Sequence, residues 1–144
     1  MLTMFDMSST QVRNEWSSVV DSVIREKPAF IKRTRDRMLL SDINVIESLL
    51  EQYTFHAELI SEDNGSITIS LNEIDLVENG DDEQEAIHKM AFAILDYAIE
   101  YYREFNIWYS ATNRKHHLPY VFKALILNDI NRIGDIITCR HGVI

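Results

Sequence analysis

The first apolar pattern along the chain predicts an amphipathic helix that begins near residue 10. Residues 8–10 are Ser, Ser and Thr, which favour the N-cap of a helix. Apolar residues then recur at three- to four-residue spacing, as on the buried face of a helix: Val12, Trp16, Val19, Val20, Val23 and Ile24. Pro28 disfavours helix in the residue before it, so the helix is predicted to end near Lys27.

A hairpin and a second helix are predicted next. Residues 29–31 and 38–40 have the composition of short strands, and the segment between them is a polar turn with a basic tip. Ser41 or Asp42 caps a short helix whose apolar residues are predicted to face a core: Ile43, Ile46, Leu49 and Leu50. These elements predict a helix–hairpin–helix module over residues 1–51.

Alternating positions predict a sheet in the second part of the chain. Apolar and polar residues alternate from Thr54 onward and again over residues 67–71, on either side of the turn at residues 63–65. A third strand is expected around residues 74–77. The predicted fold class is α+β, and residues 52–144 are predicted to form a three- or four-stranded antiparallel sheet packed on a long helix.

That long helix follows Gly80 and has the longest apolar face in the chain. Acidic residues at its start suit the positive end of the helix dipole: Asp81, Asp82, Glu83 and Glu85. The apolar face is continuous and is predicted to lie across the sheet: Ala86, Ile87, Met90, Ala91, Ile94, Leu95, Ala98 and Ile99.

The rest of the chain is predicted to be a helical extension. Pro119 suits the first turn of a helix. Two interpretations of residues 130–137 stay open, namely an extension of that helix or a new element, with Gly134 as a candidate break. Residues 138–144 are a candidate final strand.

The composition indicates a folded cytoplasmic protein. Apolar residues make up 46% and charged residues 26% of 144, which is typical of one globular domain or two small ones. No apolar run approaches the roughly 20 residues that span a bilayer, and residues 1–9 lack the features of a signal peptide. The single cysteine, Cys139, excludes an internal disulfide.

The charge is divided along the chain. Residues 1–40 contain seven Lys or Arg and five Asp or Glu, a balance of +2, whereas residues 41–144 contain seven and eighteen, a balance of −11. An acidic body repels nucleic acid, but a local basic patch can still bind phosphates. A solvated surface without a nucleic-acid partner is the alternative.

Catalysis and metal binding have no convincing residue set. His116, His117, Cys139 and His141 could supply zinc ligands, but their spacing is not that of structural zinc sites. Glycine-rich phosphate loops, nucleophile elbows and the His-Glu-x-x-His pattern are absent from the sequence. We therefore predict a protein that is not an enzyme and that needs no metal or cofactor.

Two clusters are candidates for binding macromolecules. The first is an aromatic group after the long helix, predicted to bind a partner, with core or oligomer packing as the alternative: Tyr101, Phe105, Trp108 and Tyr109. The second is the basic hairpin, whose Lys32, Arg33 and Arg35 form a phosphate-binding surface if the fold brings Arg13 to them. A symmetric dimer would double its contacts.

Residues 8–50 resemble the Phd/YefM antitoxin module. The similarity lies in a helix with Arg13 and Trp16, a hairpin introduced by Pro28, and a short helix introduced by Ser41-Asp42. Members of that family dimerise through this module and bind operator DNA. The resemblance implies DNA contacts at five residues: Thr10, Arg13, Asn14, Lys32 and Arg33. The turn departs from the family pattern, which usually has an Asn or Gly where this chain has Thr34-Arg35-Asp36-Arg37.

Residues 53–104 are similar to the HicB-type antitoxin domain in their strands around Glu62-Asp63-Asn64-Gly65 and in the long helix that follows. Together the two resemblances imply the antitoxin of a type II toxin–antitoxin system. Such a protein would repress its own operon as a homodimer, and its acidic C-terminal region would neutralise a cognate toxin, expected to be an RNase.

The dimer interface is predicted from apolar residues that a module of about 50 residues is too small to bury alone: Trp16, Val19, Val20 and Val23. Two other functions stay open. One is a small-ligand-sensing transcriptional regulator whose aromatic C-terminal domain controls the DNA-binding module. The other is an enzyme of unknown type. An adjacent toxin gene would favour the antitoxin, and a small molecule bound to the purified protein would favour the sensor.

Overall fold

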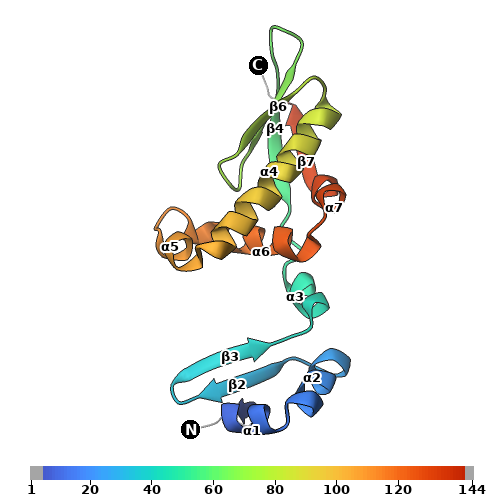
Figure 1. The fold of residues 1–144 in the computed structure, drawn as a ribbon. Coiled ribbons are helices and arrows are strands. Elements are labelled where there is room, and N and C mark those ends of the chain that lie inside the picture. Colours follow the sequence, from blue (N-terminus) through green and yellow to red (C-terminus); the bar gives the residue numbers. More distant parts are fainter. Residues whose placement is uncertain (1–4, 142–144) are drawn as a thin grey trace. The chain divides into compact units, whose positions relative to one another are not determined.

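The chain divides into two compact units, Met1–Leu49 and Leu50–Ile144. The computed structural model describes residues 5–141 of them, and its elements are labelled in Figure 1. The boundary expected from the sequence followed residue 51. Each unit has its own sheet and its own buried cluster.

The first unit contains a three-stranded sheet in the order β1-β2-β3. Strands β2 (Ala29–Arg33) and β3 (Asp36–Leu40) form the expected antiparallel hairpin. Strand β1 (Asp6–Ser8) was not expected, and it pairs in parallel with β2. The side chain of Asp6 is only 1% exposed and accepts a 2.7 Å hydrogen bond from Arg37 of β3, which fixes β1 to the sheet.

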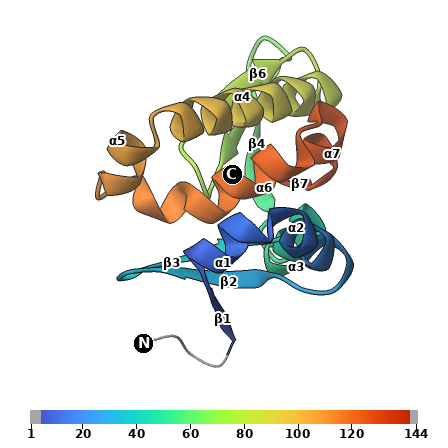
Figure 2. The same cartoon turned by 60° about the horizontal axis from the view of Figure 1, so that its bottom comes forward.

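Two helices replace the single first helix that the sequence predicted. Helix α1 (Ser9–Asn14) and helix α2 (Trp16–Arg25) are separated by Glu15, whose φ of −118° and ψ of 32° are not helical. The N–H of Glu15 still bonds to Gln11, and its carbonyl still accepts from Val19, both at 2.9 Å. The change of direction therefore sacrifices little backbone hydrogen bonding. Figure 2 shows α1 and α2 beside the hairpin.

The core of the first unit is small. Among residues 5–49, four apolar residues are buried in it: Val12, Val19, Val23 and Ile31. Trp16 and Ile24, which were expected on the buried face, are 53% and 60% exposed. Helix α3 (Ile43–Leu49) contains no buried residue, so the expectation that its apolar residues face a core is wrong. The unit leaves much apolar surface in contact with solvent.

The second unit contains a four-stranded sheet in the order β6-β5-β4-β7. Strands β4 (Phe55–Ser61), β5 (Ile67–Leu71) and β6 (Val77–Gly80) are antiparallel to their neighbours. Strand β7 (Ile137–His141) pairs in parallel with β4, so the sheet is mixed and the expectation of a purely antiparallel sheet is wrong. The last part of the predicted final strand, residues 142–144, lies outside the described residues.

The third strand of this unit begins later than predicted. It was expected at residues 74–77, but Ile74 is a buried core residue in the connection and β6 starts at Val77. Gly80 ends β6 close to the helix that follows, because a Cβ at this position would lie 2.4 Å from the backbone nitrogen of Ala86. Glycine is therefore required there by space.

Helix α4 (Glu83–Arg103) confirms the long helix packed on the sheet. Asp82 caps it by accepting a 2.8 Å hydrogen bond from the N–H of Glu85. Six residues of α4 are buried: Ala86, Met90, Ala91, Ile94, Ala98 and Tyr101. They recur every three to four residues and form one face of the helix, while the opposite face remains free of the core.

Three further helices precede β7. Helix α5 (Phe105–Ser110) and a 3-10 turn, η1 (Lys115–His117), lead into α6 (Leu118–Leu127), where Pro119 occupies the first turn as expected. Asn128 ends α6 with a φ of 46°, and Asp129 then caps helix α7 (Ile130–Asp135). Residues 130–135 are therefore a new element, and Gly134 lies within it rather than breaking it.

Within the described residues, no helix is both long enough and apolar enough to cross a membrane.

Candidate functional site

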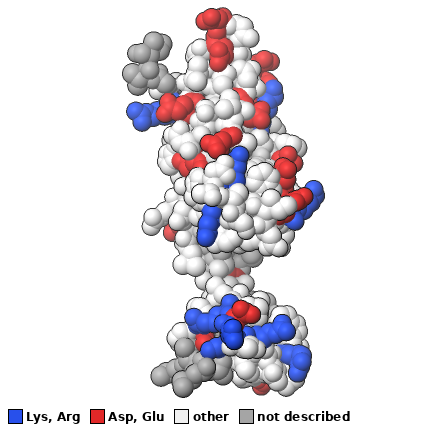
Figure 3. All heavy atoms as spheres, turned by 90° about the vertical axis from the view of Figure 1, so that its left-hand side faces the viewer, with Lys and Arg blue, Asp and Glu red and all other residues white. Residues whose placement is uncertain are grey.

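The tip of the β2–β3 hairpin presents cations to solvent. Arg33 pairs with Asp36 across the hairpin, so Thr34 and Arg35 alone form the turn. Arg33 and Arg35 are exposed, and Lys32 is half-buried. Figure 3, which looks onto this side of the first unit, shows Lys and Arg side chains gathered there. The local charge suits an anionic ligand.

The start of α1 lies at the same edge of the sheet as this turn. Strand β1 runs parallel to β2 with Ser8 opposite Lys32, and Ser8 is the N-cap of α1. The first turn of α1, which contains Thr10, therefore begins beside the end of β2. Arg13 and Asn14 are exposed one turn further along the same short helix. The fold thus brings the start of α1, with Thr10, to the end of β2 that carries Lys32 and Arg33.

A fourth cation of the hairpin has a structural role instead. Arg37 forms the 2.7 Å ion pair with Asp6. Its guanidinium also lies 5.5 Å from the centre of the Phe5 ring and 5.1 Å from that of Phe30. This role could not be predicted from the sequence, because the strand that carries Asp6 is too short to show a pattern.

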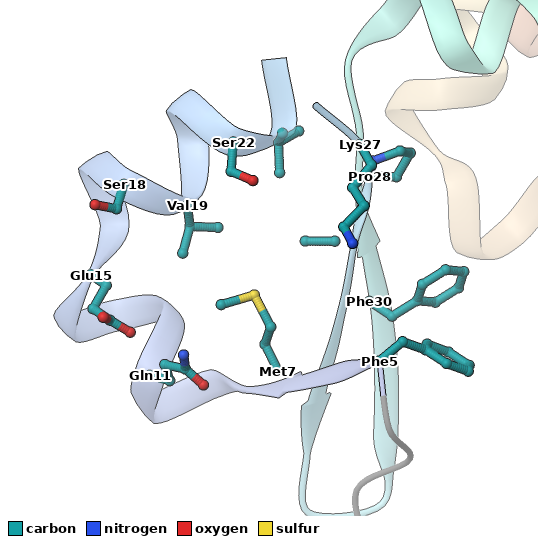
Figure 4. Close-up of a pocket in the computed structure, with 12 residues that line it drawn as sticks. Phe5, Met7, Gln11, Glu15, Ser18, Val19, Ser22, Lys27, Pro28 and Phe30 are labelled. Carbon is teal, nitrogen blue, oxygen red and sulfur yellow. The ribbon is translucent and has the colours of Figure 1, made fainter. Parts of the chain in front are cut away.

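An open hollow of about 650 Å³ lies in the first unit between α1, α2 and the strands β1 and β2. Figure 4 shows Met7 and Val19 directed into this space. Val23 also lines it, and the polar residues Gln11 and Lys27 lie around it. Two of the four predicted dimer residues, Val19 and Val23, therefore belong to the wall of an apolar hollow. Trp16 is exposed and Val20 is half-buried.

The aromatic cluster of the second unit is packed on itself. The ring of Tyr101 is buried and stacks on Trp108 at 6.2 Å, and its hydroxyl donates a 2.9 Å hydrogen bond to the carbonyl of Arg114. Phe105 stacks on Tyr109 at 5.1 Å. Tyr101 therefore supports the cluster from inside and presents no surface to a partner, whereas the other three predicted residues are half-buried.

Cations cover part of this cluster. The guanidinium of Arg114 lies 5.7 Å from the centre of the Trp108 ring, and the ammonium of Lys115 lies 5.0 Å from that of Tyr109. Arg114 also faces Asp75 at 3.7 Å. Aromatic rings joined to cations are common anchors of protein interfaces.

A buried histidine closes the inner side of the cluster. His117 is 1% exposed, and its Nδ1 lies 2.6 Å from the hydroxyl of Tyr97. Burial lowers the pKa of His117, and the neighbouring His116 lowers it further. Burial raises the pKa of Tyr97. Both groups are thus held in their neutral forms, as in a structural hydrogen bond.

The candidate zinc ligands are His116, His117, Cys139 and His141. Among residues 5–141, no group of three or more His, Cys, Asp or Glu side chains is placed to hold a metal ion. Burial and the nearby Glu83 raise the pKa of the Cys139 thiol, which disfavours the thiolate that binds metals.

Comparisons with known proteins match nearly the whole chain. A family model described as PHD_like, antitoxin of toxin-antitoxin, RelE / RelB, TA system, matches residues 1–139. A crystal structure from Syntrophomonas wolfei subsp. wolfei, described as the antitoxin part of a candidate toxin/antitoxin system, is 38% identical with a TM-score of 0.92. The match covers 96% of this chain and 100% of that chain. A search of curated proteins finds no match.

Proposed function

Because the chain belongs to the PHD-like family of RelE/RelB antitoxins, we propose that its two units divide the work of an autoregulated antitoxin. The first unit binds operator DNA as a dimer. The second unit binds and neutralises the cognate toxin, an RNase. The observation that carries this division is the charge of the units: the first contains seven acidic and seven basic residues, whereas the second contains sixteen and seven, a balance of −9.

The basic edge of the first unit supports DNA binding. Arg33 and Arg35 are exposed at the turn, and the parallel register of β1 and β2 sets the start of α1 beside them. Guanidinium groups bond phosphates in pairs of hydrogen bonds and also read guanine edges in the major groove. The neutral overall charge of the first unit means that the acidic residues repelling DNA are concentrated in the other unit.

The unburied apolar surface of the first unit supports a dimer. Its core contains four buried residues, while the apolar hollow and the exposed Trp16 remain in contact with solvent. Covering this surface with a second copy removes apolar area from water at about 25 cal/mol per Å². A two-fold dimer also presents the basic edge twice, which matches a palindromic operator.

The acidic second unit supports toxin binding. A toxin that cleaves RNA needs a basic surface, and complementary potentials accelerate the association of such a pair. Phe105, Trp108 and Tyr109 are the aromatic residues that we assign to the contact, together with the cations over their rings. The similarity of this unit to a HicB-type domain stays a prediction.

DNA binding is tested by removing one arginine at a time. Arg13→Ala and Arg33→Ala each remove two phosphate contacts per dimer, so the salt slope of binding to the upstream promoter should fall by roughly two. If either residue reads a guanine, its loss should also cost about 1–3 kcal/mol at that base pair.

Arg25→Ala is the matched control, because Arg25 is an exposed arginine of the same unit at the end of α2, away from the proposed surface. Titration at several salt concentrations with scrambled DNA separates specific from non-specific binding, and sedimentation checks the dimer content of each variant. Equal binding by correctly folded Arg13→Ala, Arg33→Ala and Arg25→Ala would reject this surface.

A further inference from the structure

Helix α4 carries a second apolar stripe that the core does not use. Phe92 is 61% exposed, Ile99 is 37% exposed and Tyr102 is 63% exposed, and the half-buried Leu95 lies between them in the sequence. The four residues follow one another at intervals of three, four and three. That spacing is the seam of a helix that packs along another helix.

The stripe is bordered by protein on one side. Ala91 and Ala98, which precede Phe92 and Ile99, are buried in the core. Helix α7 also packs close to this border, because a Cβ at Gly134 would lie 4.0 Å from the Cβ of Ala91. One border of the stripe is therefore packed against the body of the unit, and the opposite border faces solvent.

The solvent border carries charges in a regular row. Lys89, Asp96 and Arg103 are exposed and follow one another at intervals of seven, so they lie on one line along α4. Lys89 also pairs with Glu85 at 3.1 Å. In helix pairs, charges that border the apolar seam select the partner and its direction.

This row disfavours pairing between two copies of α4. An antiparallel pair centred on the seam places Asp96 opposite Asp96 and Lys89 opposite Arg103 of the other copy. A parallel pair places the row against the Ala91 and Ala98 border, which is covered by the core and offers no opposite charge. Like charges and unpaired charges both oppose association.

We propose that the α4 seam, defined as Phe92, Leu95, Ile99 and Tyr102, is the docking site for an amphipathic helix of the toxin. The proposal rests on the assignment of toxin binding to the second unit, and it adds a face of α4 to the aromatic residues assigned to that contact. The matching helix presents an apolar seam bordered by an acidic, a basic and an acidic residue at intervals of seven. The net charge of the unit attracts the toxin, and the row fixes the register.

The test measures the affinity of the full chain for the toxin encoded by the adjacent gene. Phe92→Ser and Tyr102→Ser should each weaken binding about 30-fold, the loss expected when a central apolar anchor is removed. Val77→Ser is the matched control, since Val77 is also 61% exposed but lies on the edge strand β6. It should change the affinity less than about threefold.

A charge reversal tests the register. Asp96→Lys makes the row uniformly basic, so it should weaken toxin binding several-fold and change its dependence on salt. Glu58→Lys makes the same change on strand β4 and should leave the seam contacts intact. Hydrogen exchange of the bound chain should show added protection along α4, at residues 92–102.

The outcomes separate the seam from the proposed function. If Phe92→Ser and Tyr102→Ser both bind the toxin with wild-type affinity, the seam is not the docking site. The assignment of toxin binding to the second unit would still stand, above all if Trp108→Ala weakens toxin binding. Absence of toxin binding by the wild-type chain would overturn both. Loss of homo-oligomers in Phe92→Ser, measured by sedimentation, would identify a second copy as the occupant and overturn the proposal.

Discussion

The turn of the basic hairpin stores backbone strain that a single substitution should release. Thr34 has a φ of 54°, in the left-handed region, whereas Arg35 keeps a negative φ. Two-residue hairpins with this pattern prefer glycine at the first position, because a β-branched side chain there crowds the backbone. Thr34→Gly should therefore stabilise the first unit.

The magnitude follows from two opposing terms. A non-glycine residue in the left-handed region costs about 1–2 kcal/mol. Glycine also increases the conformational entropy of the unfolded chain, which offsets about 0.5–1 kcal/mol of the relieved strain. The expected net stabilisation is about 0.5–1 kcal/mol. Thr34→Ala keeps a Cβ and should change the stability by less than about 0.5 kcal/mol.

Hydrogen exchange is the appropriate assay, because a chain of two units does not guarantee a single unfolding transition. Ile31 and Met38 are paired in the hairpin, and their amides report on the first unit alone. In Thr34→Gly their protection should rise about two- to fivefold when these amides exchange through reversible unfolding of the unit. Protection in Thr34→Gly that is no higher than in Thr34→Ala would refute the strain, because both variants lack the threonine side chain and only glycine lacks the Cβ.

Three further predictions concern the second unit. The pKa of His117 is lowered from 6.5 in the folded chain, so the unfolded chain binds this proton more readily. The free energy of unfolding should therefore fall as the pH drops below 6.5. Urea titrations at several pH values should show a smaller fall in His117→Gln than in the control His116→Gln. Gly80→Ala should destabilise the unit by about 1–3 kcal/mol, because the new Cβ would lie 2.4 Å from the backbone of Ala86. Gly134→Ala, whose new Cβ meets the Ile87 side chain at 3.6 Å in a helix, should stabilise it by up to about 1 kcal/mol; thermal unfolding that moves both variants in one direction would contradict this pair.

Local patterns predicted the elements that are long or closed by a turn. The hairpin of β2 and β3 and the helix α4 follow from apolar periodicity, a proline stop and an acidic cap. The parallel pairing of β7 with β4 could not be predicted in this way, because it joins segments some 80 residues apart. Strand β1 has three residues, which is too few to show alternation.

The candidate sites show the same limit. Periodicity placed Leu95 and Ile99 on one face of α4 together with the core residues. The structure divides that face, because Ala98 is buried while Ile99 joins the exposed Phe92 and Tyr102. The cluster of aromatic residues after the long helix predicts Tyr101 to bind a partner. Tyr101 instead lies one turn after the buried Ala98 on α4, and its side chain is buried in the core. The wide apolar face predicted for α4 therefore contains two surfaces, one packed in the core and one exposed to solvent.

A folded docking face changes the energetics of toxin capture. The α4 seam is held in its helical form by the Asp82 cap at one end and by the core beneath Ala91 and Ala98. A disordered segment of the length of residues 92–102 would lose backbone entropy worth about 1–2 kcal/mol per residue when it folded onto the toxin. The backbone of the seam is already ordered when the unit folds, so this entropy is not lost again on binding. A toxin that docks on the α4 seam would therefore not have to order this helix, and less of the binding energy would be lost to ordering.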